Sequence, residues 1–183
     1  MAPVHAYTTA HLDGELRQSE IITNLVQYAF YPPTGEAIET PHAYAIVLSQ
    51  DCDLLRDYQA MTAGAPRDLN GVLFFELEPE DEIRPKLAGG DIRRRIERHG
   101  EERYHRLGPI PPELDLLQQG LPALIIDFRR CYTLPADEIY RQCALGREDG
   151  ACRRCRLEMP YREHLQSRAA FYLQRVALPD ERG

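Results

Sequence analysis

The stretch from residue 43 to residue 55 constrains the fold more than any other part of the sequence. Residues 43–48 form a continuous run of mostly small and β-branched apolar side chains, AYAIVL, which is typical of a strand buried on both faces. Polar and reactive side chains follow at residues 49–53, SQDCD, before apolar residues return at Leu54 and Leu55. A buried strand that ends in such a cluster places it at an edge of the sheet, where binding and catalytic sites are commonly built.

Residues 49–53 are compatible with two interpretations. As a site, Asp51 and Asp53 could provide acid–base chemistry or share a cation, and Cys52 could act as a nucleophile beside a cation, although its two anionic neighbours disfavour the thiolate. As structure, Asp51 or Asp53 would cap a short helix over residues 54–61, with Cys52 as a small buried side chain. The candidate catalytic residues are Ser49, Asp51, Cys52 and Asp53. The histidines that a thiol could use are His42, His105 and His164, and their spacing selects none of them.

The composition is that of a soluble globular protein. A length of 183 residues is enough for one domain with a substantial core, and 43% hydrophobic with 28% charged residues excludes a disordered or fibrous chain. No apolar stretch approaches the roughly 18 residues that span a bilayer, and residues 1–7 lack the pattern of a signal peptide. We therefore expect a cytoplasmic protein without a membrane segment.

Apolar segments bounded by turn residues predict four or five strands. Residues 19–31 are rich in β-branched and aromatic side chains and end at Pro32 and Pro33. We expect them to form an antiparallel hairpin with the strand at residues 43–48. Further strands are predicted at residues 71–77, 103–107 and 122–132.

Helical patterns occupy much of the remaining sequence. Helices are predicted over residues 54–61, 91–99 and 113–119, from residue 134 onward, and over residues 160–176, where the pattern is amphipathic. The other segments are an N-terminal arm (1–18), a helical insertion (79–120) and a loop (146–155). The sequence thus predicts a single α+β domain over residues 1–183, a small curled antiparallel sheet or barrel with short helical insertions and a C-terminal amphipathic helix.

A second candidate site is a structural zinc centre. Cys152 and Cys155 form a C-x2-C pair, the short spacing that tetrahedral zinc sites use, and Cys143 with His164 would complete a set of four ligands. The odd total of five cysteines argues against a disulfide framework in a chain without an export signal. Ordinary free thiols are the alternative interpretation.

A basic segment is the third candidate. A positive face could bind phosphates of a nucleic acid, whereas the net charge of −7 and the interspersed glutamates favour a solvated helix with ion pairs. The arginines concerned are Arg93, Arg94, Arg95, Arg98, Arg103 and Arg106.

Two parts of the chain resemble a known family. The order of Gly14-Glu15-Leu16, a strand, a loop and a second strand ending at Ser49 is similar to the opening of MazF/PemK-type toxins, and residues 124–127 with residues 134–139 resemble their closing strand and final helix. The resemblance implies a small SH3-like barrel. In that family the loop before the second strand supplies a catalytic arginine for RNA cleavage. Residues 32–41 contain no arginine or lysine, so the resemblance implies the fold rather than the ribonuclease activity.

The Ser-x-x-Cys-Asp pattern at residues 49–53 departs from the toxins. Together with the PYREHL segment at residues 160–165, it resembles bacterial proteins of unassigned function more closely. We therefore expect a binding or regulatory module on a toxin-like small barrel, without ribonuclease activity, whose partner is another protein or a second copy of the chain. The alternative is an endoribonuclease-like or hydrolytic enzyme that uses residues 49–53.

Overall fold

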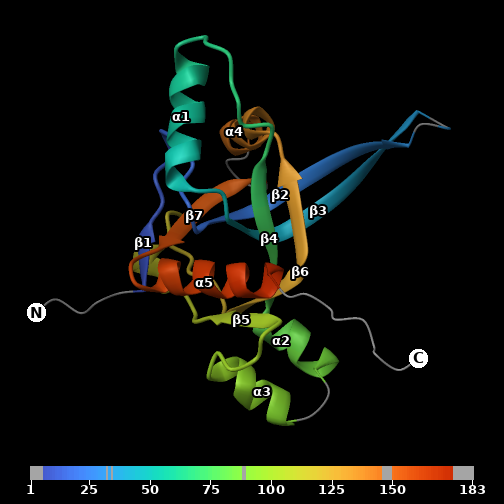
Figure 1. Cartoon of the computed structure of the whole chain (residues 1–183), viewed down its shortest axis with the longest axis vertical. Helices are drawn as coiled ribbons and strands as arrows, with labels where there is room; N and C mark the ends of the chain where they lie inside the picture. Colours follow the sequence, from blue (N-terminus) through green and yellow to red (C-terminus); the bar gives the residue numbers. More distant parts are fainter. Residues whose placement is uncertain (1–5, 32, 34, 88–89, 146–149, 175–183) are drawn as a thin grey trace, which may run out of the picture.

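The strands form one antiparallel sheet. The computed structural model describes residues 6–31, 33, 35–87, 90–145 and 150–174. This part of the chain contains β1 (Tyr7–Thr9), β2 (Glu20–Tyr31), β3 (Glu36–Val47), β4 (Val72–Pro79), β5 (Tyr104–Leu107), β6 (Leu124–Leu134) and β7 (Cys152–Leu157). The strand order is β1-β7-β2-β3-β4-β6-β5, and each pair of neighbours is antiparallel (Figure 1).

Helices connect the strands. They are α1 (Asp51–Thr62), α2 (Glu80–Ile83), α3 (Gly90–Glu97), α4 (Ala136–Leu145) and α5 (Tyr161–Leu173), with short 3₁₀ turns η1 (Arg84–Lys86) and η2 (Pro112–Leu114). The C-terminal helix is confirmed over residues 161–173, and the end of its predicted range, 175–176, lies outside the described residues. Within the described ranges, no helix is long and apolar enough to cross a membrane.

Residues 45–47 of the predicted run are buried, with side chains on both faces of the sheet, whereas Ala43 is exposed and Tyr44 and Leu48 are partly buried. Ala45 and Val47 enter one hydrophobic core and Ile46 enters another, because successive side chains of a strand point to opposite faces. Helices α1 and α4 contribute to the first core and α5 contributes to the second. The helix side chains involved are Leu54, Ala136 and Ile139 in the first core, and Leu165 and Ala169 in the second.

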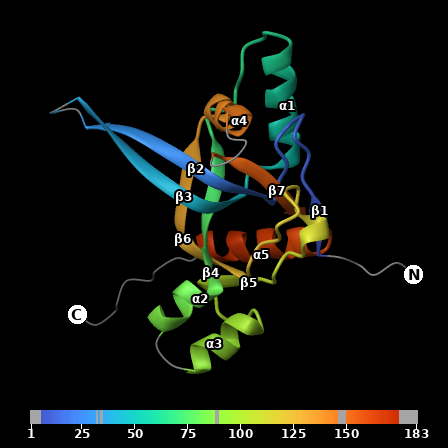
Figure 2. The same ribbon diagram turned by 180° about the vertical axis from the view of Figure 1, so that it is seen from behind.

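The predicted hairpin of β2 and β3 is also confirmed. These strands pair with each other from Ile21 to Tyr31, whereas β7 accompanies β2 only as far as Thr23 and β4 accompanies β3 only from Tyr44 onward. The rest of the hairpin projects from the body as a two-stranded arm (Figures 1 and 2).

The α+β class is confirmed, but the sheet is not closed into a barrel. β1 and β5 stand at opposite ends of the strand order, and no backbone pairing between them is found in the described ranges. The two ends nevertheless come close, since the Tyr7 hydroxyl on β1 donates a 2.9 Å hydrogen bond to the carbonyl of Gly108, just beyond β5. We call this region the open seam: the space between β1 and the segment of residues 105–111.

Two predicted elements are wrong. Residues 152–155, expected to lie in a loop, belong to β7, which pairs with both β1 and β2. Arg153 and Arg154 of this strand are buried because each meets a buried carboxylate: Arg153 pairs with Glu20, and Arg154 donates to Asp115 at 2.6 and 2.7 Å. The helix predicted over residues 113–119 is only η2 followed by a turn.

The predicted boundaries of the arm and the insertion need adjustment. Within residues 1–18, expected to be irregular, residues 7–9 form the edge strand β1. The strand predicted at residues 103–107, within the helical insertion expected over residues 79–120, is confirmed as β5 and lies at the other end of the sheet. Both segments therefore belong to the sheet, and the open seam lies between them.

Candidate functional site

The turn after β3 is held together by its own polar side chains. Ser49 Oγ accepts a 2.9 Å hydrogen bond from the backbone N–H of Leu73, which ties the turn to β4. The Asp51 carboxylate accepts hydrogen bonds from the backbone N–H of Gln18 (2.8 Å), from Arg17 Nε (3.1 Å) and from an Nη of Arg162 (2.9 Å). Asp51 therefore joins the N-terminal segment, α1 and α5.

The environment of Asp51 favours its ionised form. Partial burial opposes ionisation, but the hydrogen bonds from Arg17 and Gln18, with the charge of Arg162, outweigh it and hold the pKa of Asp51 below its ordinary value. A carboxylate held ionised between two guanidinium groups is a structural anion rather than a proton donor.

The other two candidates in this turn are exposed. The Cys52 sulfur lies 3.7 Å from Gln50 Oε1 and from Asp53 Oδ1, so the thiol contacts oxygens that do not favour a thiolate. α1 begins at Asp51 with Gln50 as its N-cap, and no side chain makes a capping hydrogen bond. The predicted cap by Asp51 or Asp53 and the predicted burial of Cys52 are therefore wrong, although both carboxylates favour the first turn of the helix.

The four residues predicted to bind zinc are not brought together. Cys155 is fully buried in the core beneath α5, whereas Cys143 packs against the core on the other side of the sheet. Burial raises the pKa of both thiols to about 12, so both stay protonated. Cys152 and Cys155 lie in one strand, where residues three apart face opposite sides. Throughout the described ranges, no group of three or more His, Cys, Asp or Glu could hold a metal ion.

Ion pairs engage part of the basic segment. Arg95 pairs with Glu101, Arg103 with Asp127, and Arg106 with Glu80. Half of the six arginines considered for nucleic-acid binding are thus paired with carboxylates.

Three histidines gather at the open seam instead. His99 follows α3, His105 lies on β5 and His164 lies on α5, and their ring centroids are 4.7, 5.1 and 5.4 Å apart. They line a cavity of about 420 Å³ that β1, β5, the following loop and α5 enclose, a size in the range of small-molecule sites. We call these residues the histidine cluster.

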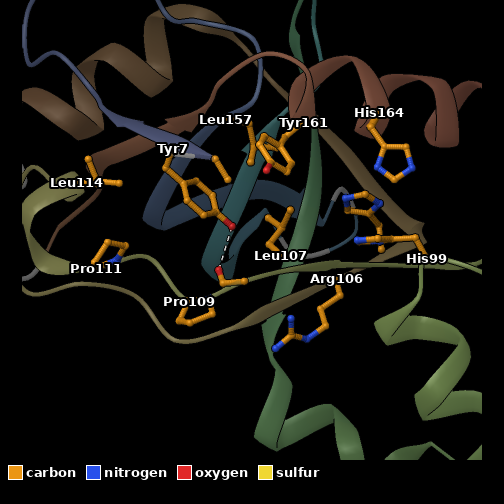
Figure 3. A pocket seen from close by; sticks show the side chains of 13 residues that line it. Tyr7, His99, Arg106, Leu107, Pro109, Pro111, Leu114, Leu157, Tyr161 and His164 are labelled. Carbon is orange, nitrogen blue, oxygen red and sulfur yellow. Dashed lines mark hydrogen bonds between the residues drawn. The ribbon is translucent and has the colours of Figure 1, made fainter. Parts of the chain in front are cut away.

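The cavity has one polar wall and one apolar wall. Figure 3 shows His99 and His164 on one side, with Pro111 and Leu114 across the cavity and Tyr7 between them. The remaining labelled residues of the lining are Arg106, Leu107, Pro109, Leu157 and Tyr161. An aromatic or aliphatic group could lie against the apolar wall while a polar group reaches the histidines.

The electrostatics of the histidine cluster disfavour protonation. Burial, reinforced by the charges of His99, Arg168 and His164, lowers the pKa of His105 to about 2. Partial burial, reinforced by His164, Arg168 and Arg106, also lowers the pKa of His99. Two imidazolium charges about 5 Å apart would repel by about 3 kcal/mol at an effective dielectric constant of about 20. In the unliganded protein His99 and His105 are therefore neutral near pH 7.

Arg168 holds the cluster in place. From α5 its guanidinium donates to the backbone carbonyls of His99, Glu101 and Tyr104, which fastens the segment between α3 and β5 to the helix. His99 itself has a positive φ of 54°, a left-handed conformation that histidine adopts more readily than most residues. A second cavity of about 340 Å³ shares His99 and His164 with the first and is lined by Arg168.

Comparison with protein-family models, with curated proteins and with solved structures finds no match to this chain. The similarity to MazF/PemK-type toxins therefore stays a prediction.

The sequence did not reveal the histidine cluster. His105 was considered only as a partner for a thiol, His164 as such a partner or as a zinc ligand, and His99 was not considered. The three positions come from separate segments with no motif spacing. The nearest local signal was His99 immediately before Gly100, at the predicted end of a helix.

Proposed function

We propose that this chain is a binding module whose site is the open seam, and that its ligand combines an apolar ring or chain with an anionic group. The observation that carries the proposal is the histidine cluster, three rings with centroids within 5.4 Å, at one wall of a 420 Å³ cavity with an apolar opposite wall. Burial is the main cause that lowers the pKa of His99, and the positive charges of Arg168 and Arg106 add to it, so two cations lie near this wall, one of them paired with Glu80. Binding sites commonly combine apolar walls with a few convergent polar groups.

The contacts of the Ser49–Asp53 turn argue against catalysis at the turn. Ser49 and Asp51 are engaged in hydrogen bonds that hold neighbouring elements together, and Cys52 has oxygens as its recorded neighbours. A nucleophile needs a base or a cation beside it. These contacts favour a binding module over the hydrolytic alternative.

Calorimetric titration of the full chain with three probes tests the proposal. Phenyl phosphate carries both a ring and an anion, phenol lacks the anion, and inorganic phosphate lacks the ring. We expect phenyl phosphate to bind roughly tenfold or more tightly than either fragment, because it engages both walls of the cavity.

The double variant His99→Ala/His164→Ala should weaken phenyl phosphate binding roughly tenfold or more. Both side chains are exposed, so the variant should fold. The matched control is His11→Ala, which removes an exposed histidine outside the cavity lining. The absence of phenyl phosphate binding to the wild-type chain, or an equal loss in both variants, contradicts the proposal.

A further inference from the structure

The spacing of the histidine cluster suits a polyatomic anion better than a metal ion. Zinc bonds to histidine nitrogen at about 2.0–2.1 Å, so its ligands must converge on one point. The described residues form no such group, although the three rings are in mutual contact. A phosphoryl group offers three terminal oxygens, each of which accepts hydrogen bonds with donor–acceptor distances of about 2.7–3.2 Å. Rings that lie close together without converging can therefore each approach a different oxygen.

A phosphoryl group also matches the number of rings. A carboxylate has two oxygens, whereas a phosphate monoester has three terminal oxygens and carries close to two negative charges at neutral pH. His105 is almost fully buried, and its Nδ1 has no hydrogen-bond partner in the part of the chain that the structure describes. A buried polar atom without a partner is unusual and costs stability.

Arg168 places a positive charge beside the cluster, whereas Arg106 is paired with a carboxylate. On β5, Arg106 is paired with Glu80, and before it Glu101 is paired with Arg95. On α5, Arg168 lies against carbonyl oxygens and influences both His99 and His105.

The other titratable groups near the cluster are tyrosines and carboxylates, and Glu101 acts on Arg168. Tyr7 faces the cavity from β1, and burial raises its pKa, so it stays neutral. Tyr161 lines the cavity from α5, and Glu102 lines the second cavity. An incoming dianion would offset the burial and the repulsion that keep His99 and His105 neutral, and would thereby favour an imidazolium.

We infer that the histidine cluster recognises a phosphate monoester in its dianionic form and takes up a proton when the ester binds. The inference rests on the proposed function, since it concerns the anionic end of the same ligand. It adds the chemical class of that end and a dependence on pH: the module holds its ligand more weakly as the pH rises.

Calorimetry of the full chain with phenyl phosphate measures the proton directly. At pH 7.5, the observed heat in buffers of different ionisation enthalpy should show net uptake of a substantial fraction of one proton per ligand. The affinity should fall between pH 7 and pH 9, by at most tenfold per pH unit for one linked proton. The ester is already a dianion in this range because its second pKa is about 6, so the fall reports protonation of the protein.

The double variant His99→Asn/His164→Gln separates proton uptake from binding. Asn and Gln retain N–H donors without titrating, and Asn tolerates the positive φ at position 99. We expect this variant to bind phenyl phosphate more weakly and with less than half of the wild-type proton uptake. The control His11→Gln should retain both.

Each contrary outcome has a distinct meaning. Binding of phenyl phosphate without proton uptake, or with uptake unchanged in the double variant, overturns the proton linkage and leaves the proposed function standing. Binding of benzoate as tight as that of phenyl phosphate overturns the selectivity for a dianion. If phenyl phosphate does not bind to the wild-type chain at all, the proposed function itself falls.

Discussion

The Ser49–Asp53 turn and the histidine cluster are both rich in polar side chains, yet they use them differently. In the turn, Ser49 and Asp51 accept hydrogen bonds from three other segments. In the cluster, the rings lie against one another at the wall of a cavity, and a buried nitrogen of His105 lacks a partner in the described ranges. Polar groups that satisfy one another build the fold, whereas polar groups left beside a cavity can serve a ligand.

Lowering the pH should reduce the free energy of unfolding through His105, and this is the largest effect that we expect. The pKa of His105 is about 2 in the folded protein and about 6.5 in an unfolded chain, so the unfolded state binds the proton first. The stability contribution is complete above pH 6.5 and is lost as the pH falls from 6.5 toward 2. Between pH 7 and pH 4.5 this amounts to about 3 kcal/mol.

The variant His105→Leu isolates that contribution. Leucine cannot titrate, so the variant should lose about 3 kcal/mol less free energy of unfolding than the wild type over the same pH interval. Urea denaturation at pH 7 and at pH 4.5 measures the difference. Equal losses of free energy of unfolding in both proteins would show that His105 can be protonated in the folded protein. The cluster would then differ less from the Ser49–Asp53 turn.

The turn should respond to removal of a single carboxylate. Asp51→Ala leaves the Gln18 N–H and two guanidinium groups without their shared acceptor, and should lower the free energy of unfolding by about 1–3 kcal/mol at pH 7. The pKa of Asp51 is lowered in the folded state, so its contribution is present above pH 4 and is lost as the pH falls below it.

The control for this substitution lies two residues away. Asp53 is exposed in the same first helical turn, so Asp53→Ala should cost no more than about 1 kcal/mol, the scale of its interaction with the helix dipole. Urea denaturation compares the two variants. Equal losses would mean that the Asp51 contacts contribute little, and that the carboxylate is free for other roles.

Local patterns predicted most of the elements. The run at residues 43–48 alternates between two cores, and its hairpin with β2 was predicted correctly because the apolar pattern of both strands is strong. Helix α5 was located correctly, but its apolar residues do not share one face: Leu165 and Ala169 are buried, whereas Phe171 and Leu173 are exposed. β7 was missed because its buried arginines look like exposed residues until their partners, Glu20 and Asp115, are known. Those carboxylates are far away in the sequence, so no local pattern could reveal the pairs.

The candidate site was harder to predict for a related reason. The sequence correctly predicted a polar turn. It could not show that the side chains of this turn already accept hydrogen bonds, because the donors, Arg17, Leu73 and Arg162, lie in other segments. The histidine cluster forms only because β1 and β5, the ends of the sheet, meet beneath α5. A site at the meeting of such distant segments is a consequence of the topology.

The smallest expected effect is at Cys52, the side chain with the most reactive chemistry in the turn. Its sulfur is exposed and its recorded contacts are two oxygens at 3.7 Å, weak interactions that a serine hydroxyl can replace. Cys52→Ser should therefore change the free energy of unfolding by no more than about 0.5 kcal/mol and leave phenyl phosphate binding unchanged. Denaturation and calorimetry measure both. A large loss of binding in this variant alone would return the functional site to the turn, because a serine preserves the shape of the side chain and removes only the thiol.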